Sequence, residues 1–470
     1  MEQVNVFDMA ERREKRAAEQ REMLDRCGLP LVCINMNIAG PVKRGALIDR
    51  AFFRALNAVA DAFGDKLRDI ALTDEKTGIE AMLAVDETAE RLKAYAERIE
   101  TEFPEGRLFD IDIIGTDGVK LSRSEPRKCL ICGQPVTACA RSRAHSVGAL
   151  QSAAAELLKN AAATQYSALA AQALLCEVHT TPKPGLVDKN NNGANDDMDA
   201  ALFELSTKTI APFFALMAKA VLDAICTSDA GFSGSFGDAA ANSEPLLPSN
   251  TVSELKRIGL LAEEAMLKAT GGVNTHRGAI FSIGLAVCAA ALFESGANAF
   301  QNACRGIAEL AGRLAEAFDY EQSSTSNGAR VRRAYGVGGA IEQAKAGFPL
   351  ALVAKSLHEE YNINSNGSGN VDPWAFALLG IMAELDDNNA LKRGGAAGAQ
   401  FVKQRANALL SKRTALTQAE LLSFDEELIA RGISCGGAAD MLAVAIFLSL
   451  AEQAAESRCI KECSDRIALS

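Results

Sequence analysis

The feature that most constrains the fold of this chain is a change of pattern near residue 147. Upstream of it, short runs rich in β-branched and aromatic residues alternate with amphipathic helical stretches, which is typical of an α+β sheet. Downstream, this alternation disappears and alanine-rich segments with helical spacing fill the chain. The pattern therefore predicts an α+β part followed by a larger all-α part.

The upstream part predicts a β-α-β-β-α-β-β order, with helices packed on one face of the sheet and a charged helix on the surface. The expected strands are 31–38, 68–73, 79–85, 107–114 and 119–122, and the expected helices are 7–26, 46–63 and 87–100. The downstream part predicts about ten helices, among them 146–176, 199–223, 254–269, 279–294 and 438–455. Because 470 residues exceed what one hydrophobic core fills, we expect two domains, residues 1–162 and 163–470.

Composition narrows the class of partner. The net charge of −11 argues against a nucleic acid or an anionic membrane surface. The N-terminus lacks the apolar segment of a targeting signal, and no run is apolar enough to suggest a bilayer span. The 12 cysteines are scattered without the spacing of a disulfide framework, which indicates reduced thiols. We therefore expect a cytoplasmic protein with no nucleic-acid partner and no membrane partner.

An acidic pair stands on the expected strand 107–114. Asp110 and Asp112 are two residues apart, so their carboxylates share one face of the strand. Two carboxylates on one face suit Mg²⁺, which binds a few carboxylates together with phosphate oxygens. Arg107 lies close by, and Lys43 follows a Gly-Pro turn before a helix, a setting that suits phosphate. The alternative is an edge strand with a solvated polar face.

Three cysteines and a histidine follow this strand. Cys129 and Cys132 form a C-x2-C pair, and Cys139 and His145 lie shortly downstream. Four such ligands in one short segment suit a tetrahedral zinc site. The alternative is a set of reduced structural thiols beside a surface histidine.

Two loops of the helical part carry unusual residues. In the first, a Pro-Lys-Pro-Gly turn presents Lys183, and acids that include Asp188 and Asp197 follow before a long helix. The second, Asn274 to Gly278, places an imidazole and a guanidinium at a helix N-terminus, which favours anions. The alternative for the first loop is an Asn/Asp-rich turn that only caps the next helix.

With these motifs in view, roughly the first 160 residues resemble holo-citrate lyase synthase, the apo-citrate lyase phosphoribosyl-dephospho-CoA transferase. The resemblance rests on Gly40 to Lys43, Arg107 to Asp112, and Arg127 to His145. It implies a nucleotidyltransferase-like fold that transfers 2′-(5″-triphosphoribosyl)-3′-dephospho-CoA to a serine of the lyase acyl carrier (gamma) subunit, with pyrophosphate leaving. Asp110 and Asp112 would then hold Mg²⁺ while Arg107 and Lys43 bind phosphates.

The stretch from about residue 165 to 451 is similar to triphosphoribosyl-dephospho-CoA synthase. The matching motifs are 182–188, Gly193 with Asp197 and Met198, 274–281, Gly328 with Arg330, 347–349, 393–395, and Ser434 with Gly436 and Gly437. That family joins ATP to 3′-dephospho-CoA through the ribose and releases adenine. Its product is therefore the substrate of the first half.

The resemblance implies roles for these residues in a substitution at an anomeric carbon. Asp188, Asp197 and Asp387 are candidates for a base or for a second Mg²⁺ site. Lys183, Arg277 and Arg393 would bind phosphate, and His276 would transfer a proton. The remaining nucleotide-binding candidates are Asn274, Arg330, Gly394 and Gly395.

A second hypothesis stays open for the helical part. Ile341, Gln343 and Ala396 stand where the synthase pattern has charged residues. In this alternative only the N-terminal transferase is active, and the helical part is a degenerate scaffold that binds coenzyme A derivatives or the carrier.

Overall fold

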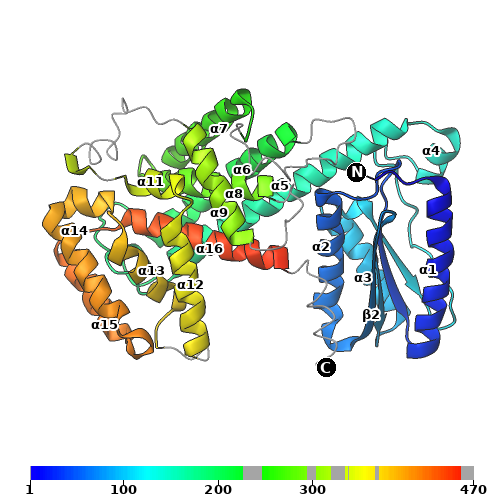
Figure 1. The fold of residues 1–470 in the computed structure, drawn as a ribbon, viewed down its shortest axis with the longest axis horizontal. Helices are drawn as coiled ribbons and strands as arrows, with labels where there is room; N and C mark the ends of the chain where they lie inside the picture. Colours follow the sequence, from blue (N-terminus) through cyan, green and yellow to red (C-terminus); the bar gives the residue numbers. More distant parts are fainter. Residues whose placement is uncertain are drawn as a thin grey trace.

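The computed structural model describes residues 2–225, 246–293, 303–318, 334–336, 338–365 and 370–456. Figure 1 shows a small part built on a sheet and a larger part built from helices, joined by the long helix α5 (Val147–His179). We call them the sheet part and the helical part. The predicted order along the chain, an α/β part followed by a mostly helical part, is confirmed.

The sheet part is built on a four-stranded antiparallel sheet with strand order β2-β3-β1-β4. Its elements are α1 (Val6–Cys27), β1 (Leu31–Met36), α2 (Ala46–Phe63), η1 (Gly64–Lys66), β2 (Leu67–Glu75), β3 (Gly78–Val85), α3 (Ala89–Glu102), η2 (Gly106–Leu108), β4 (Phe109–Ile114) and α4 (Val136–Ser142). The predicted strand 119–122 is wrong, because only one isolated bridge forms, between Ile114 and Lys120. Beyond it Arg123 and Ser124 pair with acids of α3, so the chain leaves the sheet edge.

Helices cover both faces of the sheet, which corrects the expectation of helices on one face only (Figure 1). α2 and α3 pack on one face, and α1 packs on the other, where Met23 meets Leu31 and Cys33. α1 is not merely a surface helix. Its Arg12 is buried and pairs with Glu80 of β3, with Nη2 to Oε2 at 2.9 Å. Paired charges therefore let a polar helix cover a sheet face.

The helical part begins within α5 and buries three of its helices almost completely. Its further elements are α6 (Ala200–Ile225), α7 (Ser249–Ala269), α8 (Arg277–Phe293), α9 (Ala303–Ala317), α11 (Gly339–Lys345), α12 (Pro349–Asn364), α13 (Pro373–Glu384), α14 (Asn388–Leu410), η4 (Arg413–Ala415), α15 (Gln418–Ala430) and α16 (Gly436–Glu456). The buried helices are α8, α13 and α16, whose many alanines let neighbouring backbones approach closely.

One helix departs from the expectation that no segment could span a bilayer. Gly436–Ala455 of α16 is long and apolar enough to do so by length and composition. In the structure α16 packs against α5, α8 and α12, and most of this segment is buried. Its apolar composition is thus explained by its place in the core of the helical part.

A buried arginine joins the two parts. Arg50 of α2 donates from Nε to Gln165 Oε1 at 2.9 Å and from Nη1 to the Tyr166 hydroxyl at 2.8 Å, both on α5. That hydroxyl donates to the carbonyl of Ala290 in α8 at 3.1 Å. The chain of contacts therefore runs from the sheet part through α5 into the helical core.

Candidate active sites

Asp110 and Asp112 lie on one face of β4, as the period-two pattern predicts. β4 alternates buried apolar residues with these two partly exposed acids. Lys120 Nζ lies 2.5 Å from Asp112 Oδ2, and Arg127 Nη2 lies 3.2 Å from Asp110 Oδ1. The side chains of Asp110 and Asp112 keep 43% and 23% exposure, so a solvated cation can reach both.

A third oxygen belongs to the same face. Asn35 of β1 pairs directly with Asp110 of β4, and directly paired residues share a sheet face. The buried Asn35 Oδ1 has no hydrogen-bond partner among the described residues. Two carboxylates and an amide oxygen form a donor set that fits a hard divalent cation such as Mg²⁺.

The two basic residues predicted beside this pair differ in availability. Arg107, in η2, makes no hydrogen bond or ion pair within the described residues, and burial together with the nearby Arg127 and Arg123 lowers its pKa. Lys43 donates from Nζ to the carbonyl of Ile38 at 2.5 Å, and burial lowers its pKa. Arg107 is therefore free to bind an anion, whereas Lys43 is held by its own loop.

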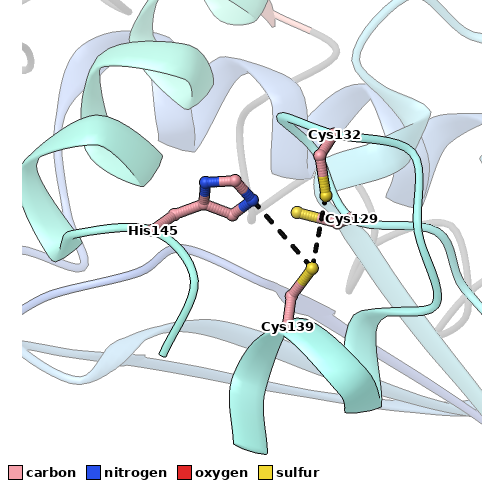
Figure 2. Close-up of side chains that lie close together, drawn as sticks. All are labelled: Cys129, Cys132, Cys139 and His145. Atoms are coloured by element: carbon pink, nitrogen blue, oxygen red, sulfur yellow. Dashed lines mark hydrogen bonds between the residues drawn. The ribbon is translucent and has the colours of Figure 1, made fainter. Parts of the chain in front are cut away.

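The three cysteines and the histidine meet between β4 and α5 (Figure 2). Cys129 and Cys132 belong to a turn, Cys139 lies on α4, and His145 precedes the first residues of α5. One ligand atom of each lies within 4.8 Å of the others. The structure thus brings together all four residues predicted as zinc ligands.

The helical part contains a cavity of about 710 Å³. Its lining includes seven of the predicted residues, which come from the loops after α5, before α8 and around the start of α14: Lys183, Asp197, Asn274, His276, Arg277, Asp387 and Arg393. Loops that are far apart in the sequence thus contribute polar side chains to one space.

Lys183 lines this cavity and is buried. Its ammonium forms an ion pair with Glu177 of α5, and both side chains are almost fully buried. Burial raises the pKa of Glu177 even with Lys183 beside it. The Pro-Lys-Pro-Gly turn is fixed by Asp425 of α15, which accepts from the Gly185 N–H at 2.8 Å. Gly185 has φ +71°, a conformation that favours glycine.

His276 presents one ring nitrogen without a partner. Its Nδ1 lies 2.7 Å from the Ser206 hydroxyl, which accepts from Thr275 Oγ1 at 2.7 Å. Since Ser206 then has its own proton to donate to Nδ1, this arrangement assigns the ring proton to Nε2. Nε2 is buried and unpaired within the described residues. Burial lowers the pKa of His276 to about 3, so the imidazole is neutral at ordinary pH.

Asp387 caps α14 and links it to α16. One carboxylate oxygen accepts from the N–H groups of Asn389 and Ala390 at 2.7 and 3.1 Å, and the other from Ala438 at 2.8 Å. Burial raises the pKa of Asp387. This carboxylate is already engaged by backbone donors, which indicates a positioning role.

Asp440 of α16 reaches the first turn of α8. A Cβ at Gly278 would overlap an oxygen of the Asp440 carboxylate, so only glycine permits this approach. Burial, with Glu177 and Asp387 nearby, raises the pKa of Asp440 well above its usual range. A raised pKa favours the protonated form of a carboxyl group, and this form can act as a general acid.

Two arginines stand at the cavity with partners that a phosphate could replace. Arg277 Nε lies 3.0 Å from Glu263 Oε2. Arg393 donates from Nη2 to Asn195 Oδ1 at 2.8 Å and also to the carbonyl of Ala194. The Arg277 side chain is 47% exposed and Arg393 is also exposed, whereas Lys183 is buried. The accessibility of both arginines suits anion binding.

Several predicted residues do not line the cavity. Asp188 is buried and accepts from the Lys183 N–H at 2.9 Å, so it orders the turn. Gly395 has φ +62° and forms a kink inside α14, and Gly394 packs against Ile433. Arg330 lies outside the described residues.

Four acids that line the cavity were given no role from the sequence: Glu177, Glu263, Asp386 and Asp440. Glu177 and Asp440 each stand as a single acid within an apolar helical stretch, a pattern that indicates a buried charge with a function. Glu263 carries no such signal, because α7 is amphipathic and rich in acids.

Comparison with known proteins matches both parts to families. Residues 163–459 match CitG, the ATP:dephospho-CoA triphosphoribosyl transferase family, and residues 4–161 match CitX, the apo-citrate lyase phosphoribosyl-dephospho-CoA transferase family. Protein CitXG of Haemophilus influenzae is 33% identical over 464 residues, which cover 93% of this chain and 94% of that protein. The chain belongs to the CitXG family.

Relatives of the CitG half alone are also known. A probable 2-(5″-triphosphoribosyl)-3′-dephosphocoenzyme-A synthase of Pseudomonas putida is 39% identical over 63% of this chain and 98% of its own length. The synthase of Klebsiella pneumoniae is 37% identical over 59% of this chain and 88% of its own length. Both halves of this chain therefore belong to transferase families.

Proposed function

We propose that this protein makes the prosthetic group of citrate lyase and attaches it to the lyase. The observation that carries the proposal is the cavity of the helical part, which gathers Lys183, His276, Arg277 and Arg393 with the acids Asp197 and Asp440. Its volume lies in the range of small-molecule sites, about 300–1,000 Å³. Its cations suit a triphosphate, and its acids suit proton transfer.

In the proposed synthase reaction, the ribose 2′-hydroxyl of dephospho-CoA attacks C1′ of the ATP ribose. The bond from C1′ to N9 of adenine breaks, the hydroxyl loses its proton to a base, and adenine gains one. Lys183, Arg277 and Arg393 would bind the triphosphate, which stays intact. Glu177, with its raised pKa, would accept the hydroxyl proton.

We assign the proton donor for adenine to Asp440, because burial and the nearby Glu177 and Asp387 raise its pKa and so favour the protonated carboxyl. This changes the role foreseen for His276, whose low pKa makes it a hydrogen-bonding group for the nucleotide rather than an acid. Asn274 accepts from the Arg277 N–H at 3.2 Å and so orders the start of α8. Asp197, exposed at the cavity, would hold Mg²⁺, which would neutralise triphosphate charge. Asp387, whose carboxylate oxygens accept from backbone N–H groups, would instead position the start of α14 against α16.

In the proposed transferase reaction, the carrier serine oxygen attacks the inner phosphorus of the triphosphoribosyl arm. The bond to the pyrophosphate oxygen breaks, and the serine proton passes to a carboxylate of the Asp110–Asp112 pair. Mg²⁺ held by this pair would stabilise the departing pyrophosphate. Arg107 would bind a phosphate, and Lys43 would keep its loop close to the site.

We also propose how these activities divide along the chain. Residues 1–162 would form a nucleotidyltransferase-like unit and residues 163–470 the synthase unit, with the boundary inside α5. The carrier would be the acyl carrier (gamma) subunit, and the reactions would take place in the cytoplasm, where thiols stay reduced. Small nucleotides, not nucleic acids or membranes, are the partners that this chemistry requires.

The synthase reaction and the transferase reaction each have their own assay. The full-length protein with ATP, Mg²⁺ and dephospho-CoA should release adenine, which chromatography measures. Supplied with the finished intermediate, it should add the phosphoribosyl-dephospho-CoA mass to the apo carrier. No adenine release with intact carrier modification would contradict the synthase and support the scaffold hypothesis. Adenine release without carrier modification would contradict the transferase.

A further inference from the structure

The segment from residue 116 to 150 has almost no hydrophobic core of its own. Among these residues only Cys129 is fully buried. A segment that buries so little apolar surface needs a covalent link or a metal to hold one conformation. We call it the clasp segment, and its one dense cluster consists of Cys129, Cys132, Cys139 and His145 (Figure 2).

The distances within this cluster fit a metal better than a disulfide. The Sγ atoms of Cys132 and Cys139 lie 3.3 Å apart, and Cys139 Sγ lies 4.0 Å from His145 Nε2. A disulfide requires about 2.05 Å between sulfurs. Tetrahedral zinc with sulfur ligands at about 2.3 Å places the ligand atoms roughly 3.5–4 Å apart. A disulfide would also leave a third cysteine and a histidine unexplained.

The backbone of the first pair forms a tight turn. The Cys129 N–H donates to the Gln134 carbonyl at 2.6 Å, and the Gly133 N–H donates to the Cys129 carbonyl at 3.2 Å. Gly133 has φ +70°, which glycine adopts without strain. The turn therefore brings two cysteines of a C-x2-C pair to one side of the chain.

The second pair of ligands is also positioned by local structure. Cys139 lies on the short helix α4, which ends at Ser142 and is followed by Arg143 in a left-handed conformation. The Ala144 N–H then donates to the Cys139 carbonyl at 3.2 Å, so the chain folds back. This reversal brings His145 towards the thiols (Figure 2).

We propose that Cys129, Cys132, Cys139 and His145 bind a structural Zn²⁺ that fixes the clasp segment. Metal binding would release the thiol protons to solvent and give each sulfur a counter-charge. With four protein ligands the metal has no open position, so it takes no part in either reaction directly.

The clasp connects two features of the transferase site. Arg127, two residues before Cys129, contacts Asp110 and donates to the Phe109 carbonyl at 2.5 Å. His145 directly precedes Ser146, whose hydroxyl caps α5 by accepting from Ala149 at 3.1 Å. Zinc would therefore hold both Arg127 beside the acid pair and α5 in its docked place.

α5 in turn closes over the Gly-Pro loop. A Cβ at Gly40 would overlap the side chain of Gln151 in the second turn of α5, so the loop and the helix are in close contact. Loss of zinc should therefore loosen the clasp segment and this contact while leaving the core of the helical part intact.

The test measures metal in the purified full-length protein. Mass spectrometry of the elements should find about one Zn²⁺ per chain in the wild type and in Cys27→Ser, a control cysteine outside the cluster. The double variant Cys132→Ser, Cys139→Ser should contain less than about a tenth of that amount. When Co²⁺ replaces Zn²⁺, the wild type should show the absorption of a tetrahedral thiolate site, and the double variant should not.

A second measurement follows the conformation without relying on activity. After chelation, trypsin should cut at the exposed Arg141 and Arg143 at least about ten times faster, while Trp374 fluorescence from the helical part stays unchanged. Zinc content equal in the double variant and the wild type, absence of zinc after growth with zinc supplied, or a Cys132–Cys139 disulfide in the purified protein would each overturn the proposal. None of these readouts depends on the synthase or the transferase.

Discussion

Replacing Lys183 with methionine should destabilise the helical part in a pH-dependent way. Methionine keeps the length and apolar stem of lysine but removes its charge. Glu177 would then lose the cation it contacts while staying buried near Asp440, whose pKa it helps to raise. The substitution therefore leaves the Glu177 carboxylate without a counter-charge in a site that has little contact with water.

The size of the effect follows from the burial of the pair. Lys183 and Glu177 have side-chain exposures of 2% and 6%, so water cannot replace the missing partner. Removing one member of a buried ion pair costs about 3–5 kcal/mol of unfolding free energy. Because Lys183 lowers the pKa of Glu177 and burial raises it, the variant should show a still higher pKa for Glu177.

The stability of the Lys183→Met variant should fall as pH rises, because the pKa of Glu177 is raised in the folded protein. A carboxyl group whose pKa is higher in the folded state than in the unfolded state binds more protons when folded. Its destabilising effect is therefore small below the unfolded value of about 4.5 and grows as pH rises towards the folded value. We expect the variant to approach wild-type stability near pH 5 and to lose the full amount near pH 8.

Urea unfolding followed by tryptophan fluorescence measures this directly. Trp374 is the single tryptophan, and it stacks on His358 with ring centroids 3.7 Å apart in the helical part. Lys208→Met, at an exposed lysine of α6, is the matched control. Adding Glu177→Gln to Lys183→Met should restore much of the loss. A Lys183→Met variant within about 1 kcal/mol of wild type at both pH values would refute the buried ion pair.

Three further variants test the sites. Asp110→Asn with Asp112→Asn should slow carrier modification by about 10²–10³-fold and leave adenine release unchanged, whereas the exposed Asp61→Asn should change neither. Gly278→Ala should slow adenine release by at least about tenfold, since its Cβ displaces the Asp440 carboxylate; an unchanged rate would contradict that contact. Asp440→Asn should slow adenine release by about 10²–10⁴-fold and remove the decline in rate at high pH that loss of the Asp440 proton causes; a wild-type pH profile would contradict its role as the acid.

The sequence predicts those features whose cause is local. The period of two along β4 placed Asp110 and Asp112 on one face without knowledge of the neighbouring strands. The short spacing of Cys129, Cys132, Cys139 and His145 likewise marked them as one possible metal site, and the structure brings their ligand atoms together. Ser146 at the start of α5 is a further local signal, because its hydroxyl caps the helix that follows it.

Contacts between distant segments could not be predicted in this way. No periodicity indicates that Gly278 must make room for Asp440 of α16, or that Asp425 of α15 fixes the turn at Gly185. These pairs depend on which helices become neighbours, and an alanine-rich helix offers many equivalent apolar faces. The second covered face of the sheet was missed because Arg12 and Arg16 of α1 face the sheet and pair with Glu80 rather than with solvent.

We propose that one chain both makes and attaches the prosthetic group. Its most direct test is the intact mass of the purified apo carrier after incubation with this protein, ATP, Mg²⁺ and dephospho-CoA, with no finished intermediate supplied. We predict that the carrier gains the mass of one phosphoribosyl-dephospho-CoA group on a serine, with one adenine and one pyrophosphate released per carrier modified. A carrier of unchanged mass, while the same preparation modifies it when given the finished intermediate, would contradict the claim.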